Sequence, residues 1–218
     1  MVVVKYKLNH FRLVLMKAII EGTAFPFNVL QGFRITPEQF EELADAEQIA
    51  RLELSASGEL IVTSPTGGDA GAKNFNLYLD LGIWNRQTKL GVAFDSSTIF
   101  ALPNGGRRSP DVSWVKLERW KSLKLIEQQG FPPIAPDFVI ELVSPSDLKS
   151  QRYKDLQIKM QEYLDNGVKL GWLIEPSAKT VEIYQSGKSV EILNNPQTLS
   201  GENVLPGFTL DLTEIFTN

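Results

Sequence analysis

The strongest constraint on the fold is a short apolar run, Phe138 to Val143, with one acid, Glu141, inside it. Because the apolar residues of this run do not alternate with polar ones, it predicts a strand that is covered on both faces of its sheet. An ionised glutamate without a partner in such a strand costs several kcal/mol. Glu141 therefore needs a cation, a metal ion or a proton, and this need is the first indication of a functional site.

A second acid, Asp111, stands in the motif Ser109-Pro110-Asp111, directly before another strand-like stretch. The chain has no cysteine, and its one histidine is His10. These counts exclude disulfides, thiolate zinc sites and cysteine nucleophiles, and they argue against a Ser-His-Asp triad or a multi-histidine metal site. Any metal ion here would be bound by oxygen ligands, which favours Mg²⁺, Mn²⁺ or Ca²⁺.

The net charge of -4 and the pI of about 5.2 argue against a protein that coats nucleic acid through its overall charge. Local basic patches are still compatible with these values. Basic residues flank both acidic motifs, and solvated helix and loop faces explain them equally well. They are Arg107, Arg108, Lys116, Arg119, Lys121, Lys124, Lys149, Arg152, Lys154 and Lys159.

The first predicted helix follows a capping box, Thr36-Pro37-Glu38-Gln39, which has proline at the first helical position. This helix is expected to run to about Ala46. Two strand-like runs, residues 50–54 and 59–63, come next, and the turn between them contains Gly58. These runs predict a β-hairpin.

No repeat, low-complexity tract or linker divides the chain after this start. We therefore expect an N-terminal extension over residues 1–33 and one α/β domain over residues 34–218. The apolar stretch from Phe11 to Ile20 contains charges and is too short to span a bilayer. The expected protein is soluble and cytoplasmic, with no membrane partner.

A long helix is predicted to begin near Asp69, because Phe75, Leu79 and Ile83 recur at helical spacing. Tyr78 and Leu81 stand beside these residues, and the helix is expected to run to about Gln87 and to pack across the sheet. Later in the chain, a helix is expected from about Leu148 to Asn166. Further strands are expected at residues 91–94, 98–102, 112–115, 138–143, 170–174, 180–184 and 189–193.

In the helix that follows Glu141, one face is apolar and Lys159 stands at its border. Arg152, Leu156, Met160 and Tyr163 form this face, whereas Lys154 and Gln161 point the opposite way. Two interpretations of Lys159 are equally compatible with this pattern. In the first, its stem packs on the core while its ammonium group reaches solvent. In the second, its ammonium group points back toward the strand of Glu141.

Asp111, Glu141 and Lys159 together resemble the site of the PD-(D/E)XK nuclease superfamily, specifically the Uma-type family of restriction-endonuclease-like proteins. The matching motifs are Ser-Pro-Asp at 109–111, Phe-Val-Ile-Glu-Leu-Val-Ser-Pro-Ser at 138–146, Lys-Met-Gln-Glu-Tyr at 159–163 and Gly-Val-Lys-Leu-Gly-Trp-Leu-Ile-Glu-Pro at 167–176. The resemblance covers residues 34 to the C-terminus. It implies a restriction-endonuclease-like core, a mixed central β-sheet flanked by helices, with an N-terminal helix and β-hairpin.

The sequence departs from the superfamily pattern at one point, because Val143 stands where the signature has a lysine. The resemblance implies that the lysine has moved to the following helix, as Lys159. It also implies that Asp111 and Glu141 bind Mg²⁺, or alternatively Mn²⁺, while Lys159 orients the nucleophile or stabilises the transition state.

A further acid is expected from the N-terminal part of this fold. Glu53, on the first strand of the hairpin, is the preferred candidate, and Asp69 is the alternative. The position of Asp69 suits helix capping at least as well.

The resulting hypothesis is a Mg²⁺-dependent endodeoxyribonuclease that binds DNA and acts as a homodimer. A catalytically inactive nucleic-acid-binding or structural module with the same fold is the main alternative. An unrelated metal-dependent hydrolase is a third.

Overall fold

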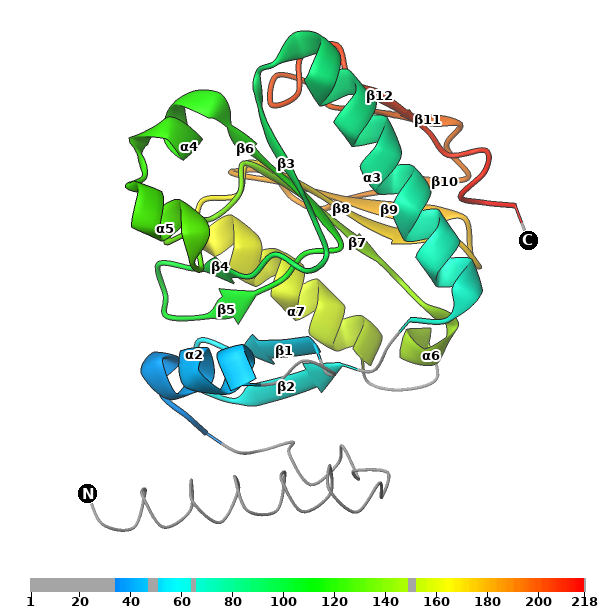
Figure 1. Cartoon of the computed structure of the whole chain (residues 1–218). Helices are drawn as coiled ribbons and strands as arrows, with labels where there is room; N and C mark the ends of the chain where they lie inside the picture. The colour runs from blue at the N-terminus through cyan, green and yellow to red at the C-terminus, as the bar shows by residue number, and fades with distance from the viewer. Residues whose placement is uncertain (1–33, 47–50, 64–65, 149–151, 218) are drawn as a thin grey trace.

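The structure, a computed structural model, describes residues 34–46, 51–63, 66–148 and 152–217 (Figure 1). The predicted extension over residues 1–33 lies outside the described residues. The helices are α2 (Pro37–Ala46), α3 (Gly68–Thr88), α4 (Leu117–Ser122), α5 (Leu125–Gln129), α6 (Pro145–Leu148) and α7 (Arg152–Asp165). The strands are β1 (Arg51–Leu54), β2 (Leu60–Thr63), β3 (Gly91–Asp95), β4 (Phe100–Ala101), β5 (Arg107–Arg108), β6 (Val112–Lys116), β7 (Phe138–Leu142), β8 (Leu170–Glu175), β9 (Thr180–Gln185), β10 (Glu191–Asn194), β11 (Thr198–Ser200) and β12 (Thr209–Asp211).

The central sheet is mixed, with the strand order β10-β9-β8-β7-β6-β3. Strands β7 and β8 are parallel, and the other neighbours in this sheet are antiparallel. Strand β7 lies inside the sheet, and all five of its residues are buried. The predicted strand around Glu141 and the predicted mixed sheet with flanking helices are therefore confirmed.

Helices cover both faces of this sheet, so the side chains of β7 divide between two cores. Phe138, Ile140 and Leu142 pack on the α3 side. Val139 and Val143 pack on the α7 side, with Met160 and Tyr163 of that helix. Because successive side chains of a strand point to opposite faces, Glu141 also faces α7.

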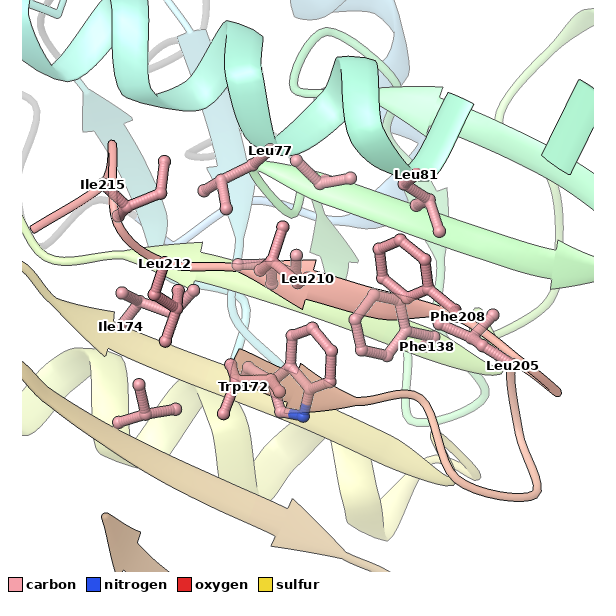
Figure 2. Packing of buried hydrophobic residues seen from close by; sticks show 14 of the residues in the cluster. Leu77, Leu81, Phe138, Trp172, Ile174, Leu205, Phe208, Leu210, Leu212 and Ile215 are labelled. Carbon is pink, nitrogen blue, oxygen red and sulfur yellow. The ribbon is translucent and has the colours of Figure 1, made fainter. Parts of the chain in front are cut away.

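The predicted long helix is present as α3, but the residues at which its helical spacing was recognised do not form its buried face. Phe75, Leu79 and Ile83 are 61%, 42% and 47% exposed, whereas Leu77 and Leu81 are fully buried. The C-terminal segment explains the difference, because its apolar side chains lie between α3 and the sheet (Figure 2). They are Leu205, Phe208, Leu210, Leu212 and Ile215. This segment includes β11 and β12, which the sequence analysis did not predict.

The N-terminal elements form a separate small sheet with the order β2-β1-β5-β4. The predicted capping box is present at the start of α2, since Thr36 Oγ1 accepts a hydrogen bond from the Gln39 amide at 3.3 Å and the Thr36 amide donates to Gln39 Oε1 at 3.0 Å. Helix α7 lies between this small sheet and the central sheet (Figure 1). This arrangement places one face of α7 within reach of strands from both sheets.

None of the helices in the described ranges is long and apolar enough to cross a membrane. The longest of them, α3, has 21 residues, but polar and charged side chains interrupt its apolar ones throughout.

Candidate active site

Asp111 and Glu141 are brought together by the pairing of β6 with β7. The antiparallel register pairs Val112 with Ile140, and one further step along both strands sets Asp111 opposite Glu141. Opposed residues of an antiparallel pair have Cβ atoms about 5 Å apart on the same face. The Leu142 amide donates to Asp111 Oδ2 at 2.9 Å, which fixes the orientation of this carboxylate.

Lys159 reaches this pair from α7. Its ammonium nitrogen lies 2.8 Å from Glu141 Oε1 and 2.8 Å from Glu53 Oε1, and it also donates to the Ser109 carbonyl oxygen at 3.3 Å. The Lys159 side chain is only 11% exposed. Its ammonium group therefore does not extend to solvent, which excludes the snorkelling interpretation.

The structure places Glu53, rather than Asp69, beside Lys159. Glu53 stands on β1 and is buried. Asp69 lies in the first turn of α3, where it forms an ion pair with Lys73 at 2.9 Å, and its side chain is 69% exposed. Asp69 lines the outer part of the same cavity, but it does not belong to the buried cluster.

Arg108 and Glu162 complete the cluster, and the sequence analysis did not assign them to it. Arg108 donates from Nη1 to Glu53 Oε2 at 3.0 Å and from Nε to Glu162 Oε2 at 2.8 Å. The Ser109 amide donates to Glu53 Oε1 at 3.2 Å. Both oxygens of Glu53 are thus held in place. The sequence signal for Glu162 was its position one helical turn after Lys159, but no local pattern links it to Arg108.

Tyr163 supplies a second contact to Glu141. Its hydroxyl donates to Glu141 Oε1 at 3.0 Å, and the tyrosine side chain is fully buried in the core beneath α7. The ammonium nitrogen of Lys159 lies 5.7 Å from the centroid of the Tyr163 ring, so the aromatic face borders the cation. Tyr163 therefore fixes the position of Glu141 from the side opposite the cavity.

The carboxyl groups of the cluster differ in their pKa values. Burial raises the pKa of Glu141 to about 8, with a further contribution from the negative charges of Asp111 and Glu53. Burial also acts on Glu53, but Lys159 and Arg108 outweigh it and lower the pKa of Glu53. Burial alone would lower the pKa of Lys159, yet Glu141 and Glu53 raise it. Of the two acids that share Lys159, Glu53 therefore ionises more readily, and Glu141 keeps its proton to a higher pH.

The chemistry of this cluster fits a divalent cation. Four carboxyl groups (Glu53, Asp111, Glu141 and Glu162) meet two cationic side chains (Arg108 and Lys159), so the cluster has an excess of acid. All of the available ligands are oxygens, as Mg²⁺ and Mn²⁺ prefer. Within the described ranges, no group of three or more acidic or histidine side chains is close enough to hold a metal ion. The side chains that would bind the cation are therefore those of Asp111 and Glu141, and water or backbone oxygens would be its further ligands.

A cavity of about 490 Å³ opens above this cluster. Asp111, Glu141 and Lys159 line its inner part, and the start of α3 and the start of α7 line its outer part. A smaller cavity of about 280 Å³ adjoins it and shares Asp69, Leu142 and Pro145 in its lining. A substrate can thus reach the buried carboxyl groups from solvent.

Comparisons with known proteins agree with this geometry. Residues 37–213 match the model of the Uma2 family, described as "Putative restriction endonuclease". Five solved chains match the structure. One is the crystal structure of a putative nuclease belonging to DUF820 from Anabaena variabilis ATCC 29413, with 22% sequence identity and a TM-score of 0.70 over 84% of this chain and 97% of that chain. No curated protein matches. At this identity, the structural match shows a shared fold.

Proposed function

Because the chain belongs to the Uma2 family of putative restriction endonucleases, we propose that it is a metal-dependent endonuclease that hydrolyses phosphodiester bonds of DNA. The observation that most supports this proposal is the position of Lys159. Its ammonium group lies between two carboxyl groups from different sheets, beside Asp111 and at the inner end of an open cavity. A lysine that served packing alone would not need two buried acids as partners.

Each residue of the cluster has a role in this proposal. Asp111 and Glu141 would hold the cation, since their carboxyl groups face the cavity from opposed positions on β6 and β7. Lys159 would donate a hydrogen bond to the attacking water or to a phosphate oxygen, where negative charge increases in the transition state. Glu53 and the Ser109 carbonyl oxygen would hold the Lys159 ammonium group in this position.

A bound Mg²⁺ ion would neutralise phosphate charge and lower the pKa of a coordinated water. The excess of acid in the cluster supports this assignment, because a divalent cation compensates the buried negative charge that Lys159 and Arg108 leave. The same negative charges add to burial in raising the pKa of Glu141.

Cleavage of supercoiled plasmid DNA with and without Mg²⁺ or Mn²⁺ tests the proposal. We expect nicked or linear products only with the metal. Asp111→Asn, Glu141→Gln and Lys159→Met should each lower the rate at least about a thousandfold, the magnitude typical of losing a group that stabilises the transition state.

Lys154→Met is a matched control for Lys159→Met. Lys154 lies on the same helix, but it is exposed and does not line the cavity, so the rate should stay unchanged. Cleavage at the wild-type rate in all three site variants would contradict the proposal. A protein that binds DNA but never cleaves it would instead support the inactive binding module.

The predicted homodimer belongs to the same proposal, because cutting both strands of a duplex needs two such sites. Sedimentation equilibrium with and without a DNA duplex would measure the oligomeric state. A protein that remains monomeric under both conditions would restrict the proposed activity to one strand at a time.

A further inference from the structure

The cavity above the cluster is acidic, which is unusual for a surface that must receive a phosphate backbone. Acidic residues dominate the charged part of its lining, and they are Glu53, Asp69, Asp111, Glu141 and Asp147. Of the described residues that line it, two are basic, Arg152 and Lys159. Lys159 is only 11% exposed and lies at the inner end of the cavity. A cation that meets the DNA strand at the mouth of the cavity must therefore stand elsewhere in the lining.

Arg152 stands where a side chain can bind DNA at the mouth of the cavity. It stands at the first residue of α7, seven residues before Lys159, and Leu156 lines the cavity between them. Seven residues are almost two full helical turns, so both side chains lie on the same helix face. Arg152 is exposed, whereas Lys159 is almost fully buried. The guanidinium group is thus at the mouth of the cavity and the ammonium group is at its inner end.

The spacing of the two cations suits successive parts of one strand. Seven residues of α-helix rise about 10 Å, which corresponds to about three phosphate steps along the axis of one DNA strand. For a DNA strand that runs along α7 with its cleaved phosphate at Lys159, Arg152 is aligned with a phosphate farther along the same strand. The planar guanidinium group can bind two phosphate oxygens at once, which a lysine cannot do.

We propose that Arg152 binds a phosphate that flanks the cleaved one and thereby positions the DNA strand in the cavity. This inference rests on the proposed nuclease function. Arg152 is a positioning residue, because it acts on binding and alignment and does not contact the bond that breaks. Its loss should weaken the binding of DNA of any sequence, since phosphate contacts contain no base information.

Lys154 offers a matched control on the same helix. It is exposed and carries the same charge as Arg152, but it does not line either cavity. Lys154→Ala and Arg152→Ala change the net charge of the protein equally. A difference between these variants therefore reports the position of the charge and not its amount. Arg152→Lys retains the charge and removes only the two-pronged geometry.

The experiment measures the affinity for a fluorescein-labelled DNA duplex by anisotropy at several salt concentrations without metal, and the cleavage of the same duplex with Mn²⁺. For Arg152→Ala we expect the Kd and the KM to rise about tenfold, with kcat changed less than about threefold. The slope of log Kd against log salt should fall by about one, because one phosphate contact is lost. Arg152→Lys should lie between Arg152→Ala and the wild type, and Lys154→Ala should equal the wild type.

The outcomes separate this inference from the proposed function. If the wild type binds DNA but does not cleave it, the proposed function fails, and the salt slopes of the variants still decide the role of Arg152. If Arg152→Ala keeps the wild-type Kd and salt slope, or if Lys154→Ala changes both by the same amount, the inference is overturned. A wild type that neither binds nor cleaves DNA overturns both. Thermal melts verify that all variants remain folded.

Discussion

Two buried acids lie at strand β7, Asp137 directly before its first residue and Glu141 near its end, and their surroundings differ in charge. Asp137 forms ion pairs with Arg119 at 2.9 Å and with Lys169 at 2.7 Å, and it accepts a hydrogen bond from the Lys116 amide at 2.9 Å. Burial opposes its ionisation, but the Lys116 amide, Lys169 and Arg119 outweigh burial and lower its pKa. Asp137 therefore stays an ionised carboxylate that two cations compensate.

Glu141 lacks such a surplus of positive charge. It shares Lys159 with Glu53 and faces Asp111. Burial raises its pKa to about 8, and the negative charges of Asp111 and Glu53 contribute to the rise. The comparison teaches that burial of an acid does not by itself indicate a functional site. The decisive quantity is the balance of charge around it, because two cations compensate one acid at Asp137, whereas acids exceed cations around Glu141.

The largest difference is expected in cleavage activity. Glu141→Gln should lower the cleavage rate at least about a thousandfold, since it removes a proposed cation ligand. Asp137→Asn should change the rate less than about threefold, because about 13 Å of strand separates the two positions. Initial rates on plasmid DNA with Mg²⁺, measured at a temperature where both variants are folded, would test this. Equal losses in the two variants would remove the functional distinction between the two acids.

The second difference concerns the free energy of unfolding. Here the variant of Asp137, and not that of Glu141, should be the less stable one. Asp137→Asn should lower the free energy of unfolding by about 2 kcal/mol at neutral pH, because it breaks a buried carboxylate's contacts with two cations. The loss is moderate because Arg119 and Lys169 are 35% and 54% exposed and remain hydrated. Glu141→Gln should instead raise the free energy of unfolding at the same pH, because folding of the wild type takes up a proton that the unfolded chain has lost, and glutamine needs no proton. Urea unfolding of both variants measures these free energies, and a larger loss in Glu141→Gln would reverse the assignment.

A third difference is expected in the pH dependence of stability. The folded-state pKa of Glu141 is above its unfolded value of 4.5, so the unfolded protein loses this proton first as the pH rises. The stability of the wild type should therefore fall by about 1 kcal/mol between pH 6 and pH 7 through this group, and Glu141→Gln should not show this fall.

The sign is reversed for Asp137, whose pKa is lowered from 3.8. Its contribution is complete above the unfolded value and is lost as the pH falls through the folded value. The cost of Asp137→Asn should thus shrink below about pH 4. Unfolding curves at several pH values would reveal both trends, and parallel trends in the two variants would contradict the difference in pKa.

A further expected effect is stabilisation by the metal. A cation that binds only the folded protein raises its stability by about 1.4 kcal/mol at ten times its dissociation constant. Because the cation must displace the proton of Glu141, Mg²⁺ should raise the Tm more at pH 8.5 than at pH 6. The effect should persist in Asp137→Asn and vanish in Glu141→Gln. A shift of the Tm that is the same in both variants would place the metal elsewhere.

Local sequence patterns were sufficient to predict many of the helices and strands. The apolar run around Glu141 predicted β7, and the capping box predicted the start of α2. Glu53 and Lys159 were selected through the resemblance to the nuclease superfamily, and the structure brings them within 2.8 Å of each other. Their roles in catalysis remain predictions.

Features that depend on contacts between distant parts of the chain could not be predicted from the sequence. Helix α3 has two apolar stripes, and the sequence alone did not reveal that the C-terminal segment would select the stripe of Leu77 and Leu81. The contact between Arg108 and Glu162 likewise joins residues of β5 and α7. Neither partner has a local neighbour that indicates the other. Long-range packing decided both cases.

The packing of the C-terminal segment has a consequence for synthesis of the protein. Leu205, Phe208, Leu210 and Ile215 fill the space between α3 and the central sheet, although the ribosome makes them after α3 and after every strand of that sheet. During translation, the face of β7 that Phe138 and Ile140 occupy stays uncovered until these residues emerge, and domains generally fold as units. The nascent chain therefore has every acid of its proposed site well before it has the core that holds them in register.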